Sequence, residues 1–447
     1  MALKITVIGT GYLGATHAAA MAELGYEVLG LDIVPEKIAM LQRGEVPMYE
    51  PGLEELLRKH VAGIEGSTGR LRFTMDWAEV AEFGDVHFMC TNTPQKHGEY
   101  ACDMSYVDRA FELLAPHLTR PALVVGKSTV PVGSADRLAD YLAAHAPAGA
   151  DAELAWNPEF LREGFAVEDT LRPDRIVVGV RSERAEKLLR EVYAVPVEAG
   201  SPFVVTDFPT AELVKTAANS FLATKISFIN AMAEVCEAAD GDVVKLAEAI
   251  GHDERIGKKF LRAGIGFGGG CLPKDIRAFM ARAGELGADQ ALTFLREIDS
   301  INMRRRGQMV EMAREALGGG SFLGKRVAVL GATFKPDSDD VRDSPALNVA
   351  GQIHLQGGQV TVYDPKGMDN ARRLFPTLGY ADTAVAAVRG ADVVLHLTEW
   401  REFRELDPAT LGEAVRARVV LDGRNALDPA LWRKAGWTFR AMGRPTA

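Results

Sequence analysis

The stretches KITVIGTGYLG (4–14) and GYEVLGLD (25–32) decide how the chain begins to fold. An apolar run enters a turn with glycines at positions 9, 11 and 14, an alanine-rich segment follows, and a second apolar run ends at Asp32. This succession of strand, glycine turn, helix and strand is typical of a dinucleotide-binding domain. Further strand-like runs at 86–91 and 122–128 predict a doubly wound parallel sheet in the first part of the chain.

The end of the chain repeats this pattern. GGQVTVYD (357–364) parallels GYEVLGLD (25–32), and strand-like runs flank it at 326–331, 391–397 and 418–423. The turn after the first of these runs reads Gly331-Ala-Thr-Phe-Lys and lacks the glycine pattern. We therefore expect the second copy to bind something other than a dinucleotide.

Helical spacing of apolar residues prevails between the two copies, from about 207 to 317. The fold class predicted is α/β, with two Rossmann-like doubly wound parallel-sheet domains joined by a helical central domain. The predicted boundaries are 1–205, 206–318 and 319–447. Helical connectors of this kind often carry a dimer interface, which periodicity alone does not establish.

Composition excludes several classes of protein. The net charge of −10 over 447 residues provides no basic field for nucleic acid or an anionic membrane surface. No apolar run approaches the roughly 20 residues of a membrane span, and the start of the chain does not resemble a signal peptide. The four cysteines are irregularly spaced, so we expect reduced thiols in the cytoplasm, with neither a disulfide framework nor a metal site.

The glycine turn and Asp32 indicate the cofactor. Gly9, Gly11 and Gly14 let backbone N–H groups approach a pyrophosphate at a helix N-terminus. Asp32 would accept a hydrogen bond from a ribose 2′-hydroxyl and repel a 2′-phosphate, which favours NAD over NADP. The alternative is that Asp32 belongs to an ordinary turn at the end of a strand.

A second glycine-rich stretch, GIGFGGGCLPKD (264–275), precedes a predicted helix. So many glycines suggest that the backbone passes close to a ligand. Cys271 stands at the helix N-terminus, where the helix dipole favours a thiolate. The residues alone leave two alternatives open, a nucleophile and a small buried side chain.

Other polar residues could converge on a substrate. Lys215 and Asn219 share one helical face and could bind one oxygen, although from spacing alone two solvated surface residues are the more common outcome. The charges of NPEFLREG (157–164) could serve acid–base chemistry or form a solvated loop. Lys335 and Arg342 could hold phosphates in a loop at the end of a strand.

Together these segments resemble the UDP-glucose/GDP-mannose dehydrogenase family almost from end to end. PDRIVVG (173–179) and GHDERIGKKF (251–260) are most similar to the branch that oxidises UDP-glucose. The sequence departs from the family's pattern at Trp156, where a small residue is common and which could narrow the pocket, and at Gly270, where serine often precedes the cysteine. The other motifs of the resemblance are GTGYLG (9–14), CTNTP (90–94), STVPVG (128–133), NPEFLREG (157–164), GFGGGCLPKD (266–275) and FKPDSDDVRDSP (334–345).

The resemblance implies that the N-terminal domain binds NAD, that the C-terminal domain binds UDP, and that UDP-glucose is oxidised twice through a thioester on Cys271. It also implies a homodimer or larger homo-oligomer, with Arg255 reaching the sugar nucleotide across the dimer interface. The implied catalytic residues are Cys271, Lys215, Asn219, Asp275, Glu159 and Thr129. The implied NAD-binding residues are Gly9, Gly11, Tyr12, Leu13, Gly14, Asp32, Lys37, Thr93, Thr129, Glu163, Lys274 and Arg342. The implied substrate-binding residues are Glu159, Phe160, Leu161, Arg162, Glu163, Lys215, Asn219, Arg255, Phe260, Gly268, Phe334, Lys335 and Arg424.

Three other readings of the sequence compete with this one. A sister enzyme acting on GDP-mannose or UDP-N-acetylmannosamine would use the same catalytic groups. A non-catalytic regulator with Cys271 as a redox sensor would need neither Lys215 with Asn219 nor an acid beside the thiol. A one-step hydroxyacid or hydroxyacyl dehydrogenase would leave the second repeat and Cys271 without a role.

Overall fold

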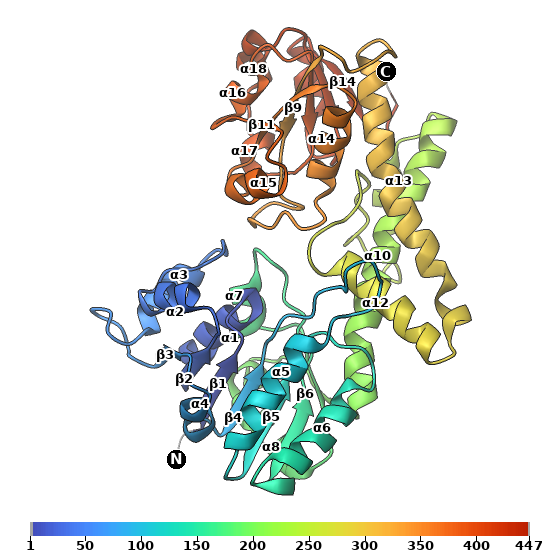
Figure 1. Ribbon diagram of the computed structural model, residues 1–447. Helices are drawn as coiled ribbons and strands as arrows, with labels where there is room; N and C mark the ends of the chain where they lie inside the picture. Colours follow the sequence, from blue (N-terminus) through green and yellow to red (C-terminus); the bar gives the residue numbers. More distant parts are fainter. Residues whose placement is uncertain (1–2, 446–447) are drawn as a thin grey trace. The chain divides into compact units, whose positions relative to one another are not determined.

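The computed structural model describes residues 3–445, which form two compact units. The first unit runs to Ala218 and also contains Arg277–Leu286. The second unit contains Asn219–Ile276 and the chain from Gly287 onward. Each unit is built around one sheet, and Figure 1 shows both sheets with their helices.

The first sheet has eight strands in the order β3-β2-β1-β4-β5-β6-β7-β8. All neighbours pair in parallel except β6 and β7, which are antiparallel. The strands are β1 (Lys4–Ile8), β2 (Glu27–Leu31), β3 (Leu71–Thr74), β4 (Val86–Met89), β5 (Ala122–Gly126), β6 (Ala152–Trp156), β7 (Ile176–Gly179) and β8 (Phe203–Thr206).

Helices cover both faces of this sheet because successive strand residues point to opposite sides. Ile5 and Val7 of β1 join one buried cluster, and Ile8 joins the other. The helices are α1 (Tyr12–Glu23), α2 (Pro35–Gln42), α3 (Leu53–His60), α4 (Trp77–Phe83), α5 (Ser105–Leu114), α6 (Ser134–His145), α7 (Ala166–Leu171), α8 (Glu183–Val192) and α9 (Ala194–Glu198).

The middle of the chain is helical, as its periodicity predicts. It comprises α10 (Phe208–Ala239), α11 (Val243–Gly251), α12 (Leu272–Glu285) and α13 (Thr293–Ala316). Met309 and Val310 of α13 belong to the same buried cluster as Val327 of the second sheet. The helix α13 therefore packs on that sheet within the second unit.

The second sheet has six parallel strands in the order β11-β10-β9-β12-β13-β14. Its strands are β9 (Arg326–Leu330), β10 (Gln359–Tyr363), β11 (Gly379–Tyr380), β12 (Val393–His396), β13 (Val419–Asp422) and β14 (Thr438–Ala441). Its helices are α14 (Pro345–Leu355), α15 (Met368–Leu374), α16 (Ala384–Val388), α17 (Arg401–Arg404), α18 (Pro408–Ala414) and α19 (Pro429–Lys434).

Both sheets share one topology. Counted within its own sheet, each places its first six strands in the order 3-2-1-4-5-6, which is the Rossmann order. The predicted fold class, two doubly wound sheets with a helical segment between them in sequence, is therefore confirmed. The three predicted boundaries stay a prediction. None of the helices within residues 3–445 is long and apolar enough to cross a membrane.

Candidate active site

The glycine turn of the first unit leaves no room for a side chain at Gly9 or Gly14. Gly9 has a φ of +88°, and a Cβ there would lie 2.9 Å from the carbonyl oxygen of Cys90. A Cβ at Gly14 would lie 1.8 Å from the carbonyl oxygen of Gly9. Gly11 precedes α1, whose first turn contains Leu13. The turn thus forms a cradle of bare backbone at a helix N-terminus, which fits the pyrophosphate of NAD.

Asp32 follows β2 and is buried. Its Oδ2 accepts hydrogen bonds from the Thr10 N–H at 2.9 Å and from Lys37 Nζ at 2.7 Å. Burial alone would raise the pKa of Asp32, but Lys37 and backbone donors bring that pKa below its usual value. Asp32 is therefore a carboxylate at neutral pH, which is the state that would accept a hydrogen bond from a ribose hydroxyl.

Asp364, which follows β10 in the second unit, occupies the position of Asp32 in the repeat. A carboxylate has about four acceptor positions, and those of Asp364 are filled by the protein's own donors. Six donors thus contact Asp364, whereas four contact Asp32, so Asp364 is the more fully occupied of the two carboxylates. The donors belong to Ala332, Thr333, Lys366, Gly367 and Trp400.

A buried carboxylate that the sequence analysis did not single out, Glu50, joins α1 to the loop after β6. The Tyr12 hydroxyl donates to Glu50 Oε2. The N–H groups of Gly164 and Ala166 each donate to Glu50 at 2.7 Å. Glu163, predicted to bind cofactor and substrate, is buried beside Gly164. Glu50 therefore holds a predicted NAD-binding helix and a predicted substrate loop together.

Three predicted residues follow neighbouring parallel strands of the first sheet. Thr93 follows β4 and is buried, Thr129 follows β5 and is partly buried, and Glu159 follows β6. Since β4 pairs with β5 and β5 with β6 in parallel, all three lie at the carboxyl edge of the sheet. Ligands of doubly wound sheets bind at that edge.

The loop after β6 is organised by the Glu159 carboxylate. Its Oε1 accepts hydrogen bonds from the N–H groups of Phe160 at 2.7 Å and Leu161 at 2.9 Å. The Phe160 ring lies 5.6 Å from Lys215 Nζ, within range of a cation–π contact. Arg162 instead pairs with Asp169 at 2.6 Å on the outside of the loop.

The α10 pair is buried. Lys215 and Asn219 lie one turn apart, with 8% and 7% of their surfaces exposed, so the alternative of two solvated residues does not apply. Asn219 Nδ2 donates to Asp275 Oδ2 at 2.6 Å, and Lys274 Nζ lies 2.8 Å from Asp275 Oδ1. Asp275 is thus fixed by an amide and a cation at the start of α12.

Cys271 is exposed, whereas the other three cysteines are buried. It stands immediately before α12, and its carbonyl oxygen accepts the N–H of Asp275 at 2.9 Å. An exposed thiol at a helix N-terminus suits a nucleophile better than a packing residue.

The glycine loop before Cys271 is held by arginines within the second unit. Carbonyl oxygens of the loop accept hydrogen bonds from Arg305, Arg306 and Arg424. A Cβ at Gly268 would lie 2.2 Å from the carbonyl oxygen of Asp343. Glycine at position 268 is therefore needed for close packing against the second unit's own backbone.

At Gly270 a Cβ would lie 2.3 Å from Arg342 Cζ. The Arg342 guanidinium pairs with Asp340 at 2.7 Å. Lys335 Nζ lies 5.5 Å from the centre of the Phe334 ring. The loop after β9 thus gathers three of the residues predicted to bind cofactor and substrate near the glycine loop.

Two predicted residues lie in the segment after α11. Arg255 is exposed and pairs with Asp253 at 2.6 Å. Phe260 has a φ of +63°, a backbone conformation that non-glycine residues rarely adopt. Trp156, in contrast, does not narrow a pocket, since it is buried in the core beneath Gly126.

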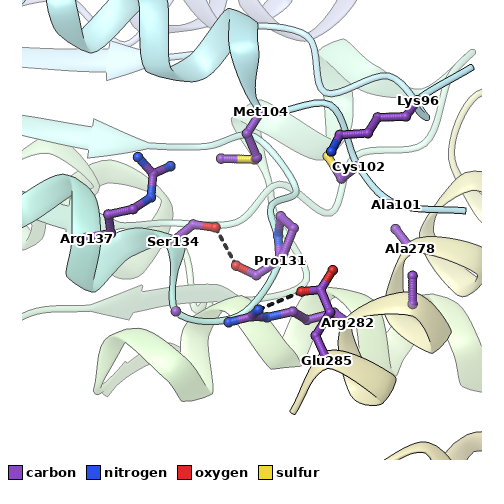
Figure 2. A pocket seen from close by; sticks show the side chains of 12 residues that line it. Lys96, Ala101, Cys102, Met104, Pro131, Ser134, Arg137, Ala278, Arg282 and Glu285 are labelled. Carbon is purple, nitrogen blue, oxygen red and sulfur yellow. Dashed lines mark hydrogen bonds and ion pairs between the residues drawn. The ribbon is translucent and has the colours of Figure 1, made fainter. Parts of the chain in front are cut away.

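A cavity of about 310 Å³ lies in the first unit beside α6 and the last turns of α12 (Figure 2). Arg282 lines it, donating to the Val132 carbonyl at 2.9 Å and pairing with Glu285 at 2.7 Å. Its lining includes no predicted cofactor- or substrate-binding residue. Within residues 3–445 no cluster of three or more His, Cys, Asp or Glu side chains could hold a metal ion.

Comparison with known proteins places this geometry in a family. Three models of the UDP-glucose/GDP-mannose dehydrogenase family match in order, namely the NAD binding domain over 3–196, the central domain over 209–304 and the UDP binding domain over 328–429.

Individual relatives match the chain over nearly its whole length. The UDP-glucose 6-dehydrogenase of Rhizobium meliloti (strain 1021) is 41% identical over 99% of this chain and 100% of that protein. A UDP-glucose dehydrogenase structure from Pyrobaculum islandicum has a TM-score of 0.89 at 36% identity, covering 99% of this chain and 98% of that one. A UDP-D-ManNAc dehydrogenase from Pyrococcus horikoshii has a TM-score of 0.86 at 28% identity, with both chains covered completely.

Proposed function

Because this chain belongs to the UDP-glucose/GDP-mannose dehydrogenase family, we propose that it oxidises UDP-glucose to UDP-glucuronate in two NAD-dependent steps. The observation that carries the proposal is the 41% identity to a UDP-glucose 6-dehydrogenase over the whole of both chains. The exposed Cys271 beside the buried Asn219–Asp275 pair supports the same chemistry.

NAD, when bound, supplies the hydride acceptor for each oxidation. We assign its pyrophosphate to the turn of Gly9, Gly11 and Gly14, and its ribose to Asp32 with Lys37 beside it. The further contacts proposed for the cofactor are Tyr12, Leu13, Thr93, Thr129, Glu163, Lys274 and Arg342.

In the first oxidation, the substrate hydroxyl loses its proton as hydride leaves its carbon. The proton goes to a water molecule held by Thr129, Lys215 and Asp275. The product of this step is an aldehyde. Asp275, fixed by Asn219 and Lys274, can hold that water in one orientation.

The second oxidation passes through a covalent adduct. The Cys271 thiolate adds to the aldehyde carbon, and Lys215 and Asn219 stabilise the oxyanion, each donor being worth about 3 kcal/mol. Loss of hydride from this thiohemiacetal leaves a thioester. Water assisted by Glu159 or Asp275 hydrolyses the thioester, which releases the carboxylate and returns the thiolate.

The sugar nucleotide is assigned to the second unit and to the loop after β6. Its UDP group suits the domain whose family model is described as UDP binding. The substrate contacts proposed are Glu159, Phe160, Leu161, Arg162, Glu163, Lys215, Asn219, Arg255, Phe260, Gly268, Phe334, Lys335 and Arg424.

We also propose a homodimer. Its interface is assigned to the helical domain 206–318, which lies in the sequence between the domains 1–205 and 319–447. Phe221, Phe228 and Val235 form an apolar stripe on α10, with 67%, 47% and 57% of their surfaces exposed. Their spacing of seven residues keeps them on one helical face, as a helix–helix interface requires. A cytoplasmic location suits four cysteines without a disulfide.

The stoichiometry of NADH tests this function. Purified protein receives excess NAD and limiting UDP-glucose, and NADH absorbance is followed to completion. Two NADH per UDP-glucose is the expected result. One NADH would contradict the thioester route, because the reaction would then stop at the aldehyde.

The same assay separates the sister substrates. The likeness to a UDP-D-ManNAc dehydrogenase structure makes UDP-N-acetylmannosamine the first competitor to include, with GDP-mannose as the second. Two NADH with either competitor and none with UDP-glucose would keep the chemistry but refute the proposed substrate.

A further inference from the structure

Lys127 is a buried cation that no step above uses. It directly follows β5, two residues before Thr129, with 4% of its surface exposed. Its Nζ lies 3.1 Å from Glu159 Oε2, 3.1 Å from Asn157 Oδ1 and 3.4 Å from the Tyr193 hydroxyl. An ammonium group has three hydrogen-bond donors, so these three acceptors match its full capacity.

Glu159 is correspondingly fixed by its donors. Its Oε1 accepts hydrogen bonds from the N–H groups of Phe160 and Leu161, while Oε2 accepts a hydrogen bond from Lys127 Nζ. A carboxylate offers about four acceptor positions, two on each oxygen. The position that remains is on Oε2, so the side chain has one orientation and one place for a further donor such as water.

Charged and titratable groups from several elements surround this pair. Glu159 faces Lys127 after β5, Lys215 on α10, Cys90 after β4 and Tyr193 after α8. Burial raises the pKa of both Cys90 and Tyr193 to about 12, so both are neutral at physiological pH. His17 of α1, which faces Lys127, is neutral as well, because burial and that cation hold its pKa well below its ordinary value.

Each of the two buried charges stabilises the ionised form of the other. Burial alone would raise the pKa of Glu159, but the nearby Lys127 charge and hydrogen bond, a backbone N–H and the Lys215 charge bring it below the ordinary value. Burial likewise lowers the pKa of Lys127, and Glu159 more than restores it. Removing one charge would leave the other buried without compensation, which is costly.

We propose that Lys127 is a positioning residue for thioester hydrolysis: it keeps Glu159 ionised and in one orientation, with Oε2 directed at the attacking water. The inference rests on the proposed function. The water oxygen bonds to the thioester carbon, its proton passes to Glu159 Oε2, and the carbon–sulfur bond breaks to return the Cys271 thiolate. Glu159 then releases the proton to solvent.

The pH profile of NADH formation tests this role in the wild type and in Lys127→Met. Without the cation, Glu159 should become protonated at higher pH, so the acid limb of kcat should move up by at least one unit. At a pH on that limb, Lys127→Met should therefore lower kcat by a factor about ten times larger than the factor by which it lowers kcat on the plateau. KM for UDP-glucose should change less than about threefold, since Lys127 is buried and its three donors meet acceptors of the protein.

Tyr193→Phe is the matched control, because it removes a hydrogen bond from the same buried cluster without changing a charge. The acid limb of its kcat profile should lie at the same pH as in the wild type. An equal shift in Tyr193→Phe and Lys127→Met would overturn the proposal in favour of a purely structural role. If Lys127→Met does not fold, Lys127→Gln replaces it, since glutamine keeps a donor but not the charge.

A second readout is independent of turnover. Carbon-13 NMR of glutamate-labelled protein, with Glu159→Gln to identify the resonance, gives the titration midpoint of Glu159 directly. The midpoint should rise in Lys127→Met and stay unchanged in Tyr193→Phe. A wild type that forms no NADH from UDP-glucose would refute the proposed function, whereas an unmoved midpoint in an active Lys127→Met variant would refute this inference alone.

Discussion

The guanidinium of Arg424 donates a 2.8 Å hydrogen bond from Nη1 to the carbonyl oxygen of Gly266, in the loop that precedes Cys271. Its Nε and Nη2 donate to the carbonyl oxygens of Leu397 and Phe334. One side chain therefore ties the loop before Cys271 to the segments that follow β12 and β9. Arg424, predicted to bind substrate, also has this structural role in the second unit.

Arg424→Lys should weaken both structure and catalysis. One ammonium cannot reach three carbonyl groups in different directions, and each unpaired buried carbonyl costs about 1–3 kcal/mol. Denaturant unfolding should show a free energy of unfolding lower by about 2 kcal/mol, and kcat/KM for UDP-glucose should fall at least about tenfold. Arg262→Lys is the control, because Arg262 and Arg424 both pair with Glu399, at 3.6 Å and 3.4 Å, but the Arg262 side chain is 65% exposed. Equal effects in the two variants would contradict the role given to the Gly266 bond.

Cys271 should react first with a thiol reagent. It is exposed while Cys90, Cys102 and Cys236 are buried, so the native protein should show one fast thiol and three slow ones. In Cys271→Ser the fast phase should disappear and formation of two NADH per UDP-glucose should be lost. Cys236→Ser serves as the control and should retain both properties. Full turnover in Cys271→Ser would eliminate the thioester.

Asp32→Ala should reduce the discrimination against NADP. The substitution removes the carboxylate that would bind the ribose hydroxyl and leaves Lys37, whose Nζ lies 2.7 Å from Asp32 Oδ2, beside the position of a 2′-phosphate. Initial-rate measurements should show KM for NAD raised about tenfold or more, with NADP becoming a measurable substrate. An unchanged ratio of kcat/KM for the two cofactors would show that Asp32 belongs only to a turn.

Local backbone geometry made some features predictable from sequence. The turn at Gly9 and the strand end at Asp32 follow from short-range rules, because a positive φ and a strand-to-helix reversal depend on neighbouring residues. The repeated topology followed for the same reason, since β9 and β10 reproduce the pattern of β1 and β2.

Long-range pairs could not be predicted in this way. Asn219 is buried because it meets Asp275, 56 positions later, and Lys127 because it meets partners 30 and 66 positions later. Such contacts depend on the order of the strands and the path of the loops. From one sequence these residues therefore cannot be distinguished from ordinary polar residues. Their burial and these distant partners distinguish them from solvated polar residues.

Glu212 should make stability depend on pH. It is buried in the first unit, where its oxygens accept the N–H groups of Gly133 and Ala135 at 2.7 Å each, yet burial raises its pKa to about 7. The folded protein therefore holds a proton on Glu212 that the unfolded chain loses at its ordinary pKa of 4.5. Folding binds more protons in this window, so the contribution of Glu212 to stability declines as pH rises from about 4.5 to about 7.

Glu212→Gln should remove that decline, because the amide stays neutral throughout. Thermal unfolding at pH 5 and pH 8 should show a wild-type melting temperature that falls more between the two values than that of the variant. The difference should correspond to about 2–3 kcal/mol. Glu168→Gln is the control, since Glu168 is exposed on α7 and should reproduce the wild-type dependence. A Glu212→Gln curve parallel to the wild type would contradict the raised pKa and mean that the two backbone N–H groups keep Glu212 ionised at every pH tested.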